Sequence, residues 1–282
     1  MPNSPYSAAQ AARHALGQRL KEIRKSNGMT ARAFAARAGW SESKASRIEN
    51  GKTFPADADL RAYAELCGAP EAYPDLLAAA HGIEGMYVEW RRLQRDGMRH
   101  AQQAHVSLYE RTEHFRIYEP SVIPGILQTR NYARAIMGTI SAFRHLPDDV
   151  DAAVDVRMRR QHILRDAGRR FGIILEEAAL RARFGNSDVM AAQLGHLLTV
   201  TSRQQVSLGI VPFTVNRRMW PLEGFWIFGN EQVLIELATA QVTVKQPSEI
   251  ETYERMFSEL VSIARYGKHA RALIAEAIHA LG

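Results

Sequence analysis

The first part of the chain repeats short apolar patterns at the spacing of an α-helix. Leu16, Leu20 and Ile23 recur at helical intervals, and Asn27-Gly28 after them is a helix stop signal. The same pattern, bounded each time by capping residues or a glycine, continues along the chain. Helices are therefore predicted over residues 14–28, 30–39, 41–51, 56–68 and 70–82. Five short helices in so short a stretch predict one compact all-α domain.

Beyond residue 115 the pattern changes, because segments rich in Ile, Val and Phe predict strands. Strands are expected at 170–181, 206–212, 224–230 and 233–244, and helices at 150–166, 187–203, 247–267 and 268–281. Residues 115–137 read as an extended apolar piece, a Pro-Gly turn and a helix. The expected fold is multidomain: an N-terminal all-α five-helix domain, then an α+β or α/β domain with about four strands.

The same patterns set the expected boundaries. A flexible tail is expected over 1–13, a DNA-binding domain over 14–82, one linking helix over 83–115, and a regulatory or partner-binding domain over 116–282. Gly97 is the weak point of the linking helix.

Residues 30–51 meet the steric demands of a helix-turn-helix. A small residue, Ala35, allows the two helices to pack closely, and Gly39 four positions later accepts the left-handed backbone of the turn. Ala45 and Ile48 lie three apart and face inward. The two helices are thus predicted to pack through these four positions.

The opposite face of the second helix is predicted to enter the major groove of DNA. Lys and Arg can donate hydrogen bonds to guanine O6 and N7, Asn can bond to adenine, and Ser can act as donor or acceptor. The free N–H groups at a capped helix N-terminus favour binding of a phosphate. Glu49 is expected to make a structural contact instead. The predicted DNA-binding residues are Thr30, Arg32, Ser41, Glu42, Ser43, Lys44, Ser46, Arg47, Asn50 and Lys52.

Charge is concentrated in the same region. The chain has a formal net charge of +6, and the segment from Arg13 to Leu66 holds 11 Lys or Arg against 6 Asp or Glu. A localised basic surplus suits a polyanionic partner. The single Cys67 rules out a disulfide framework within the chain, which suits a reducing cytoplasm, and neither a membrane span nor a secretory signal is expected.

The stretch from Leu16 to Leu66, above all "SRIENGK", resembles the DNA-binding domain of Xre/Cro-type repressors. The resemblance implies a five-helix fold, operator binding and a homodimer on a two-fold site. The family commonly has Gln at the start of the first motif helix, where this chain has Ala31, so Thr30 and Arg32 are the candidates for phosphate contacts.

The rest of the chain resembles the long C-terminal domain of actinobacterial regulators of the WhiJ kind. The resemblance lies in "YEPSVIPGILQTRNYARAIM", "RMRRQHIL", "ILEEAALRARFG", "QLGHLL" and "VSLGIVPF". It implies control of development or specialised metabolism and a very small co-encoded partner protein. For such a regulator a cytoplasmic, nucleoid-associated location is expected. Some such regulators are antitoxin-like.

A weaker candidate site combines aromatic and basic residues near residue 220. Alternation along 224–229 sends Phe225 and Ile227 to one face of a strand and Trp226 and Phe228 to the other. Exposed aromatics usually mark a partner. The candidates for a partner or ligand are Trp220, Trp226, Phe228, Arg217 and Arg218.

Three further features are expected to be structural. Ile123, Ile126 and Leu127 surround a Pro-Gly corner, and Glu176 and Glu177 beside Arg181 and Arg183 suit ion pairs better than a paired-carboxylate active site. His100, His105 and His114 lack metal-ligand spacing.

No nucleotide-binding, hydrolase or CxxC motif is present, so neither an enzyme, a cofactor nor a metal is expected. Two functions remain open. One is a transcriptional regulator that senses a small partner protein or a small molecule. The other is an antitoxin-like protein that sequesters its partner and regulates its own operon.

Overall fold

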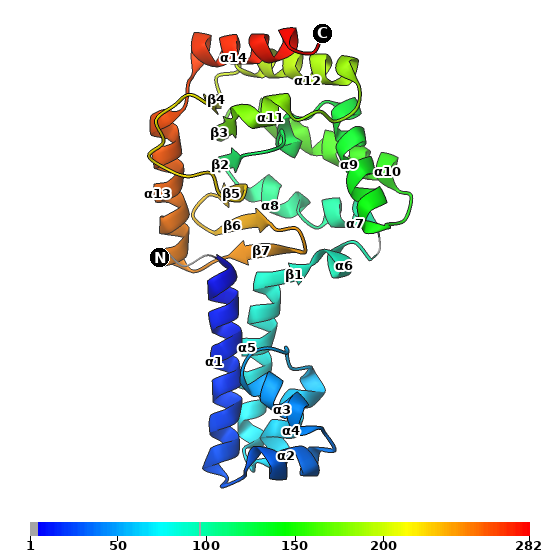
Figure 1. Cartoon of the computed structure of the whole chain (residues 1–282), viewed down its shortest axis with the longest axis vertical. Coiled ribbons are helices and arrows are strands. Elements are labelled where there is room, and N and C mark those ends of the chain that lie inside the picture. Colours follow the sequence, from blue (N-terminus) through cyan, green and yellow to red (C-terminus); the bar gives the residue numbers. More distant parts are fainter. Residues whose placement is uncertain (1–4, 96) are drawn as a thin grey trace. The chain divides into compact units, whose positions relative to one another are not determined.

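The computed structural model describes residues 5–95 and 97–282, which divide into two compact units between Val88 and Glu89. The N-terminal unit contains α1 (Pro5–Ser26), α2 (Ala31–Ala38), α3 (Glu42–Glu49), α4 (Asp57–Leu66), the 3-10 turn η1 (Pro70–Ala72) and α5 (Tyr73–Met86) (Figure 1). The prediction of five helices is confirmed. Helix α1 begins inside the stretch expected to be a tail, because its alanine-rich start favours helix.

The core of the N-terminal unit gathers one face of each helix. Leu20, Phe34, Ile48, Leu60 and Tyr63 are all buried. The rings of Phe34 and Tyr63 stack with centroids 4.1 Å apart, which joins α2 to α4. The core therefore sits behind α2 and α3 and fixes which sides of these two helices remain outside.

The C-terminal unit is built on a mixed sheet. Its strands are β2 (His114–Glu119), β3 (Arg170–Glu176), β4 (Val206–Val211), β5 (Phe225–Phe228), β6 (Gln232–Glu236) and β7 (Ala240–Val244). Within the unit the strand order is β7-β6-β5-β2-β3-β4, and the short strand β1 (Tyr87–Glu89) spans the boundary between the two units. Strands β2, β3 and β4 are parallel, and β5, β6 and β7 continue the sheet antiparallel to their neighbours.

The strand count exceeds the four expected, for two local reasons. The segment 233–244, expected as one strand, is the hairpin β6–β7, whose turn is closed by the Leu237 N–H donating to the Ala240 oxygen over 2.8 Å. That turn contains neither Gly nor Pro, so the usual turn signal is absent. The extended piece after residue 114 is strand β2.

Helices surround this sheet. They are α6 (Trp90–Leu93), α7 (Met98–Gln103), α8 (Val106–Arg111), α9 (Arg130–Arg144), α10 (Val150–Arg160), α11 (Glu177–Arg181), α12 (Ser187–Val200), α13 (Pro247–Ile263) and α14 (Gly267–His279), with 3-10 turns η2 (Gly125–Leu127) and η3 (Gln161–Arg165). The α+β fold expected for this part of the chain is confirmed.

The single linking helix expected over 83–115 is not formed. Gly97 has a φ of +93°, which breaks the helical path, and the Asp149 carboxylate accepts the N–H groups of Met98 and Arg99 at the start of α7 over 3.0 and 2.8 Å. The Trp90 indole donates to the Leu237 carbonyl over 2.8 Å. Contacts with distant residues therefore divide this stretch into β1, α6, α7 and α8.

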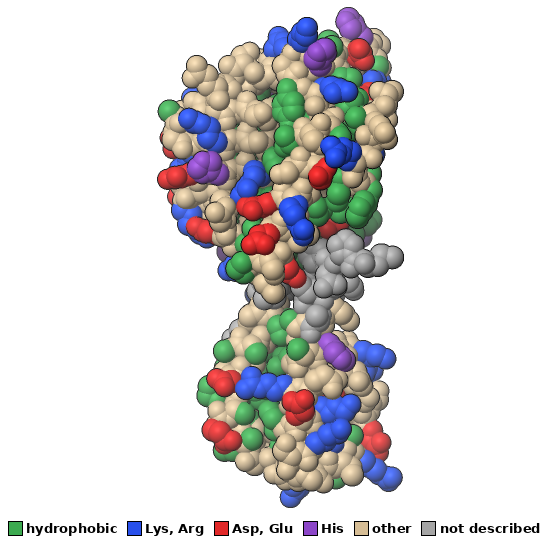
Figure 2. Space-filling model, turned by 90° about the vertical axis from the view of Figure 1, so that its left-hand side faces the viewer, with side chains coloured by type: hydrophobic (Ala, Val, Ile, Leu, Met, Phe, Trp, Pro, Cys, Tyr) green, Lys and Arg blue, Asp and Glu red, His purple; other side chains and the backbone are tan. Residues whose placement is uncertain are grey.

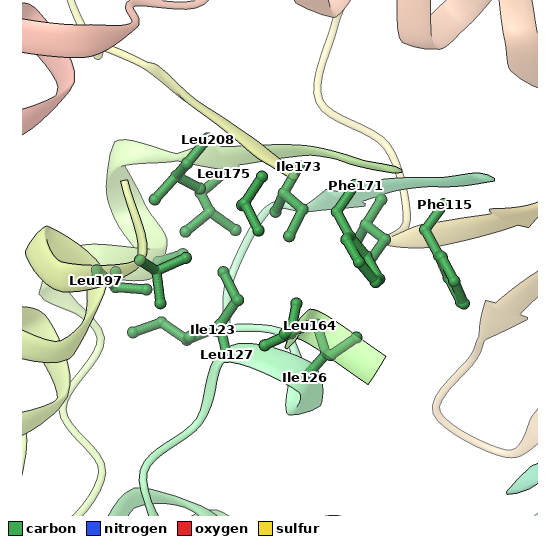
Figure 3. Close-up of a cluster of buried hydrophobic side chains, with 14 of the residues drawn as sticks. Phe115, Ile123, Ile126, Leu127, Leu164, Phe171, Ile173, Leu175, Leu197 and Leu208 are labelled. Carbon is green, nitrogen blue, oxygen red and sulfur yellow. The ribbon is translucent and has the colours of Figure 1, made fainter. Parts of the chain in front are cut away.

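The sheet has two faces that the register defines. The Phe115 face carries Phe115, Phe171 and Trp226, and the Tyr118 face carries Tyr118, Glu176 and Phe225. On the Phe115 face, strand side chains meet Ile126 and Leu127 of η2, Leu164 of η3, and Ile123, which precedes η2 (Figure 3). The Pro-Gly corner is thus a structural part of the core, as expected. Helix α13 packs on the Tyr118 face, where Tyr253 contacts Phe225.

Among the helices of the described ranges, none has the length and apolar character needed to cross a membrane.

Candidate nucleic-acid interface

Helices α2 and α3 are joined by a turn with a left-handed glycine. The Thr30 hydroxyl caps α2 by accepting the Ala33 N–H over 3.1 Å, and Gly39 ends it with a φ of +68°. The Trp40 N–H donates back to the Ala35 oxygen over 2.8 Å. The Ser41 hydroxyl then starts α3 by accepting the Lys44 N–H over 3.2 Å. These local bonds produce the helix-turn-helix that the sequence predicts.

The inward face of this pair follows the predicted pattern. Ala35, Ala45 and Ile48 are buried, and so is Phe34 on α2. Gly17 lets α1 approach the end of α3, because a Cβ there would lie 2.7 Å from the Ile48 oxygen and 2.6 Å from the Glu49 oxygen. The backbone of α1 therefore supports α3 from behind.

Glu49 lies inside the domain and holds α3 in place. Arg24 on α1 donates to its two carboxylate oxygens over 2.6 and 2.7 Å, and the Tyr63 hydroxyl on α4 donates over 3.1 Å. Burial raises the pKa of Tyr63, and the nearby carboxylate raises it further. These three residues tie α3 to α1 and α4, so Glu49 is structural, as expected.

Most of the predicted DNA-binding side chains lie outside. Lys44 is half-buried, and the others are exposed: Thr30, Arg32, Ser41, Glu42, Ser43, Ser46, Arg47, Asn50 and Lys52. The Lys44 ammonium bonds to the Asp59 carboxylate over 2.6 Å and lies 4.0 Å from the centroid of the Trp40 ring. The positive charge of Lys44 is therefore compensated within the domain. The spacing of residues along α3 does not reveal these contacts, because Asp59 lies on α4 and Trp40 in the turn.

The remaining outward side chains differ in whether they bond to other residues of the domain. Arg32 pairs with Glu42 over 3.5 Å, and the Asn50 amide donates to the Ser46 oxygen over 2.8 Å at the end of α3. Arg47 and Lys52 form no ion pair or side-chain hydrogen bond with any residue of 5–95 or 97–282. They are the free cations of this predicted set.

The five aromatic and basic candidates of the C-terminal unit do not form one site. Phe228 is buried in the core of the Phe115 face, and Trp226 is half-buried beside it. Trp220 lies in the loop between β4 and β5 and is 53% exposed. Arg217 binds Glu176, and Arg218 pairs with Glu259 over 3.7 Å.

The expected ion pairs at the end of β3 are formed with one change of partner. Arg181 donates to Glu177 over 2.8 Å, whereas Glu176 binds Arg217 from the loop after β4. Arg183 donates instead to the Ala280 carbonyl over 3.4 Å. Both carboxylates are thus occupied by arginines, as a structural role requires.

Two interior arginines of α10 were missed by the sequence reasoning. Arg157 and Arg160 follow Ala153 at intervals of four and seven residues, so they continue the inward face of that helix. A charged residue in a buried stripe is the signal that reveals them.

The fold and the α2–α3 geometry define the class of this protein as a helix-turn-helix protein, and a family model described as a helix-turn-helix domain matches residues 15–77. A second family model, described as a domain of unknown function (DUF5753), matches residues 102–276, and the chain belongs to this family.

Comparison with individual proteins adds only distant likenesses. No curated protein matches the chain. Among solved structures, a phospholipase D family member, Nuc, from Salmonella typhimurium is 13% identical, with a TM-score of 0.33, over 59% of this chain and 90% of that one. TrmBL2, an archaeal chromatin protein, is 12% identical, with a TM-score of 0.33, over 73% of this chain and 66% of that one.

Proposed function

We propose that this chain is a sequence-specific transcriptional regulator of the Xre/Cro type. The observation that carries the proposal is the position of α3 in the N-terminal unit. Ser41 caps this helix, its inward-facing Glu49 bonds to Arg24 on α1, and its outer side is exposed. Ser43, Ser46 and Arg47 there have the chemistry to read base edges in the major groove. Lys52 and the Thr30 cap would contact the phosphate backbone.

Electrostatics support the same role. The segment from Arg13 to Leu66 has 11 basic against 6 acidic residues. On the visible face of the C-terminal unit, basic and acidic side chains are interspersed (Figure 2). A basic domain attached to a domain of mixed charge suits a protein whose N-terminal unit meets DNA. In this proposal it binds a two-fold operator as a homodimer, and the C-terminal unit receives a signal and performs no catalysis.

The proposal is tested by selecting bound duplexes from a random DNA pool and measuring affinity by gel shift. For the selected duplex, Arg47→Ala is expected to cost roughly 1–3 kcal/mol, about a 5- to 150-fold loss, and to relax preference at the base that Arg47 reads. Lys52→Ala is expected to weaken selected and random duplexes alike. Lys44→Met is expected to cost less than Arg47→Ala, because Asp59 already holds that charge.

The matched control is Arg130→Ala, which removes the same charge from an exposed side chain of the C-terminal unit. It is expected to leave binding unchanged. Failure of the pool to yield any enriched sequence, or equal affinity of wild type and Arg47→Ala, would contradict the proposal.

A second function is favoured by exposed aromatic side chains on the loop between β4 and β5. Phe213 is 56% exposed and Trp220 is 53% exposed, and such groups usually mark a partner surface. They support an antitoxin-like role in which the chain captures a small co-encoded protein. The test is co-purification with the product of the neighbouring small gene. Phe213→Ser with Trp220→Ser should abolish the complex and leave DNA affinity intact.

A further inference from the structure

Several arginines of the C-terminal unit differ in the partners they bind. Some at the surface pair with carboxylates, for example Arg130 with Asp155 and Arg134 with Asp151. Arg144, Arg157 and Arg160 instead donate to glutamine side chains, and no carboxylate among residues 97–282 lies within salt-bridge distance of them. The charge of these three guanidinium groups is therefore not neutralised by direct pairing with a carboxylate of residues 97–282.

Two of these guanidinium groups converge. Arg157 donates to Gln128 over 2.7 Å and to the Gln102 side-chain oxygen over 3.3 Å, and Arg160 donates to the same Gln102 oxygen over 3.2 Å. Arg160 also lies 4.1 Å from the centroid of the Tyr109 ring and is buried. A neutral amide satisfies hydrogen bonds but not charge, and an unpaired charge away from water is unfavourable.

The sheet supplies the facing groups. Glu119 ends β2 and Glu236 ends β6, and the register places both on the Phe115 face with Trp226. The Trp226 indole donates to Glu119 over 2.8 Å, and its ring lies 5.7 Å from that of Tyr109. Glu119, Arg157 and Trp226 are half-buried and Glu236 is exposed, so these side chains border space that solvent reaches.

The charges of Glu119, Glu236 and Arg157 influence one another's pKa values. The pKa of Glu119 is raised to about 8, mainly by burial, and the pKa of Arg157 is lowered to about 10, by burial first and by the charge of Arg160 second. Partial desolvation by the surrounding protein raises the pKa of Glu236 as well, although its side chain reaches solvent, and the charges of Arg157, Arg144 and Arg160 lower it. With a raised pKa, the Glu119 carboxyl does not fully offset the positive charge of the arginines at neutral pH.

The location agrees with ligand sites in other sheets. Glu119 lies at the carboxyl end of a parallel strand, where the chain leaves the sheet for η2, and β5 beside it runs in the opposite direction. In open α/β sheets, ligands bind outside the carboxyl ends of strands where the chain connections diverge.

We propose that the C-terminal unit binds a small molecule that carries a carboxylate or a phosphate, held by Arg157 and Arg160 and facing Glu119 and Trp226. Two guanidinium forks match the oxygens of either anion. The half-buried Trp226 offers ring surface to the rest of the molecule, and protonated Glu119 can donate a hydrogen bond to it. The inference rests on the proposed function, because this molecule would be the signal that the regulator receives.

The test is calorimetric titration of the full chain, without DNA, with inorganic phosphate and with benzoate at constant ionic strength. Wild type is expected to bind at least one of these probes, and Arg157→Gln with Arg160→Gln to bind it at least about tenfold more weakly. The matched control is Arg130→Gln with Arg134→Gln, which removes two charges from exposed positions of α9. It is expected to bind as wild type does.

A second double variant distinguishes loss of the anion site from misfolding of the glutamine double variant. Arg157→Lys with Arg160→Lys keeps both charges but loses the planar forks, and weaker binding with a native near-ultraviolet circular dichroism spectrum is expected. Absence of binding of both probes to wild type up to high millimolar concentration would overturn the proposal. Equal binding by wild type and the glutamine double variant would overturn it too, because the anion would then bind elsewhere, including the basic N-terminal unit.

The two proposals fail separately. If the anion binds through Arg157 and Arg160 but no duplex is selected, the transcriptional function is wrong and the anion site stands. If a duplex is selected and neither probe binds, the anion site is wrong and the regulator stands. If both bind, the gel shift repeated with the anion measures their coupling.

Discussion

Each unit contains the same three-residue arrangement, an arginine that forks onto a glutamate while a tyrosine donates to the same carboxylate. In the N-terminal unit these are Arg24, Glu49 and Tyr63, and in the C-terminal unit Arg217, Glu176 and Tyr118. The carboxylates are equally buried, but the arginine side chain is 6% exposed in the first and 28% exposed in the second.

The difference lies in what each arrangement joins. Arg24 comes from α1, so the first connects three helices and holds α3 rigidly against the core. Arg217 comes from the loop between β4 and β5, so the second fastens a loop to the carboxyl end of β3 on the Tyr118 face. The same chemistry thus holds a helix in place in one unit and a loop in the other.

The largest effect is expected for Glu49→Gln. The change leaves Arg24 buried without its counter-charge, so the unfolding free energy of the N-terminal unit should fall by about 3–5 kcal/mol. Urea unfolding followed by the fluorescence of Trp40, which packs in this unit, measures it. The control Asp75→Asn breaks the exposed pair with Arg19 and should cost under about 1 kcal/mol. Equal effects of the two changes would contradict the buried role of Glu49.

A smaller effect is expected for Glu176→Gln. Arg217 can turn toward water when it loses its partner, so the loss should be about 1–3 kcal/mol, and the loop should open before the unit unfolds. Faster tryptic cleavage at Arg217 and Arg218 under native conditions is the readout. Glu231→Gln, which breaks the exposed pair with Arg111, provides the control and should leave cleavage unchanged. Unchanged cleavage in Glu176→Gln would show that the loop is held by other contacts.

The smallest effect on stability is expected from ionisation of the two tyrosines at alkaline pH. Here the two units should lose stability to a similar extent. Burial, followed by the nearby carboxylate, raises the pKa of both Tyr63 and Tyr118 above the ordinary value of 10.0. Each contributes stability that is complete below pH 10 and is lost as the pH rises above it, because the unfolded chain releases the proton first. The expected loss is about 1.4 kcal/mol per pH unit for each tyrosine.

Tyr63→Phe and Tyr118→Phe should each remove their share of this loss. Thermal unfolding of both variants between pH 9 and pH 11 measures it, with Tyr73→Phe as the control at a less buried site. If wild type and both core variants lost stability with the same slope, the two tyrosines would not be the groups responsible.

Local sequence was sufficient for the helix-turn-helix. Gly39, Ala35, Ala45 and Ile48 act through contacts within one pair of adjacent helices, so spacing alone predicted which face is inward. The same reasoning placed Lys44 among the DNA-facing residues and missed its bond to Asp59, because that partner lies fifteen residues away on α4. It also merged β6 with β7, since their turn lacks the residues that usually mark one.

The sequence by itself therefore determined the helices of the N-terminal unit, most of the strands of the C-terminal unit and the outward face of α3, because each depends on periodicity and capping over a few neighbouring residues. Only the tertiary structure decided which charges are compensated. Arg24, Arg157 and Arg217 are chemically identical in the sequence, yet one is locked in a core, one borders an interior polar space and one fastens a loop. Their partners come from distant segments, and burial sets the energy of a charge only after the chain has folded.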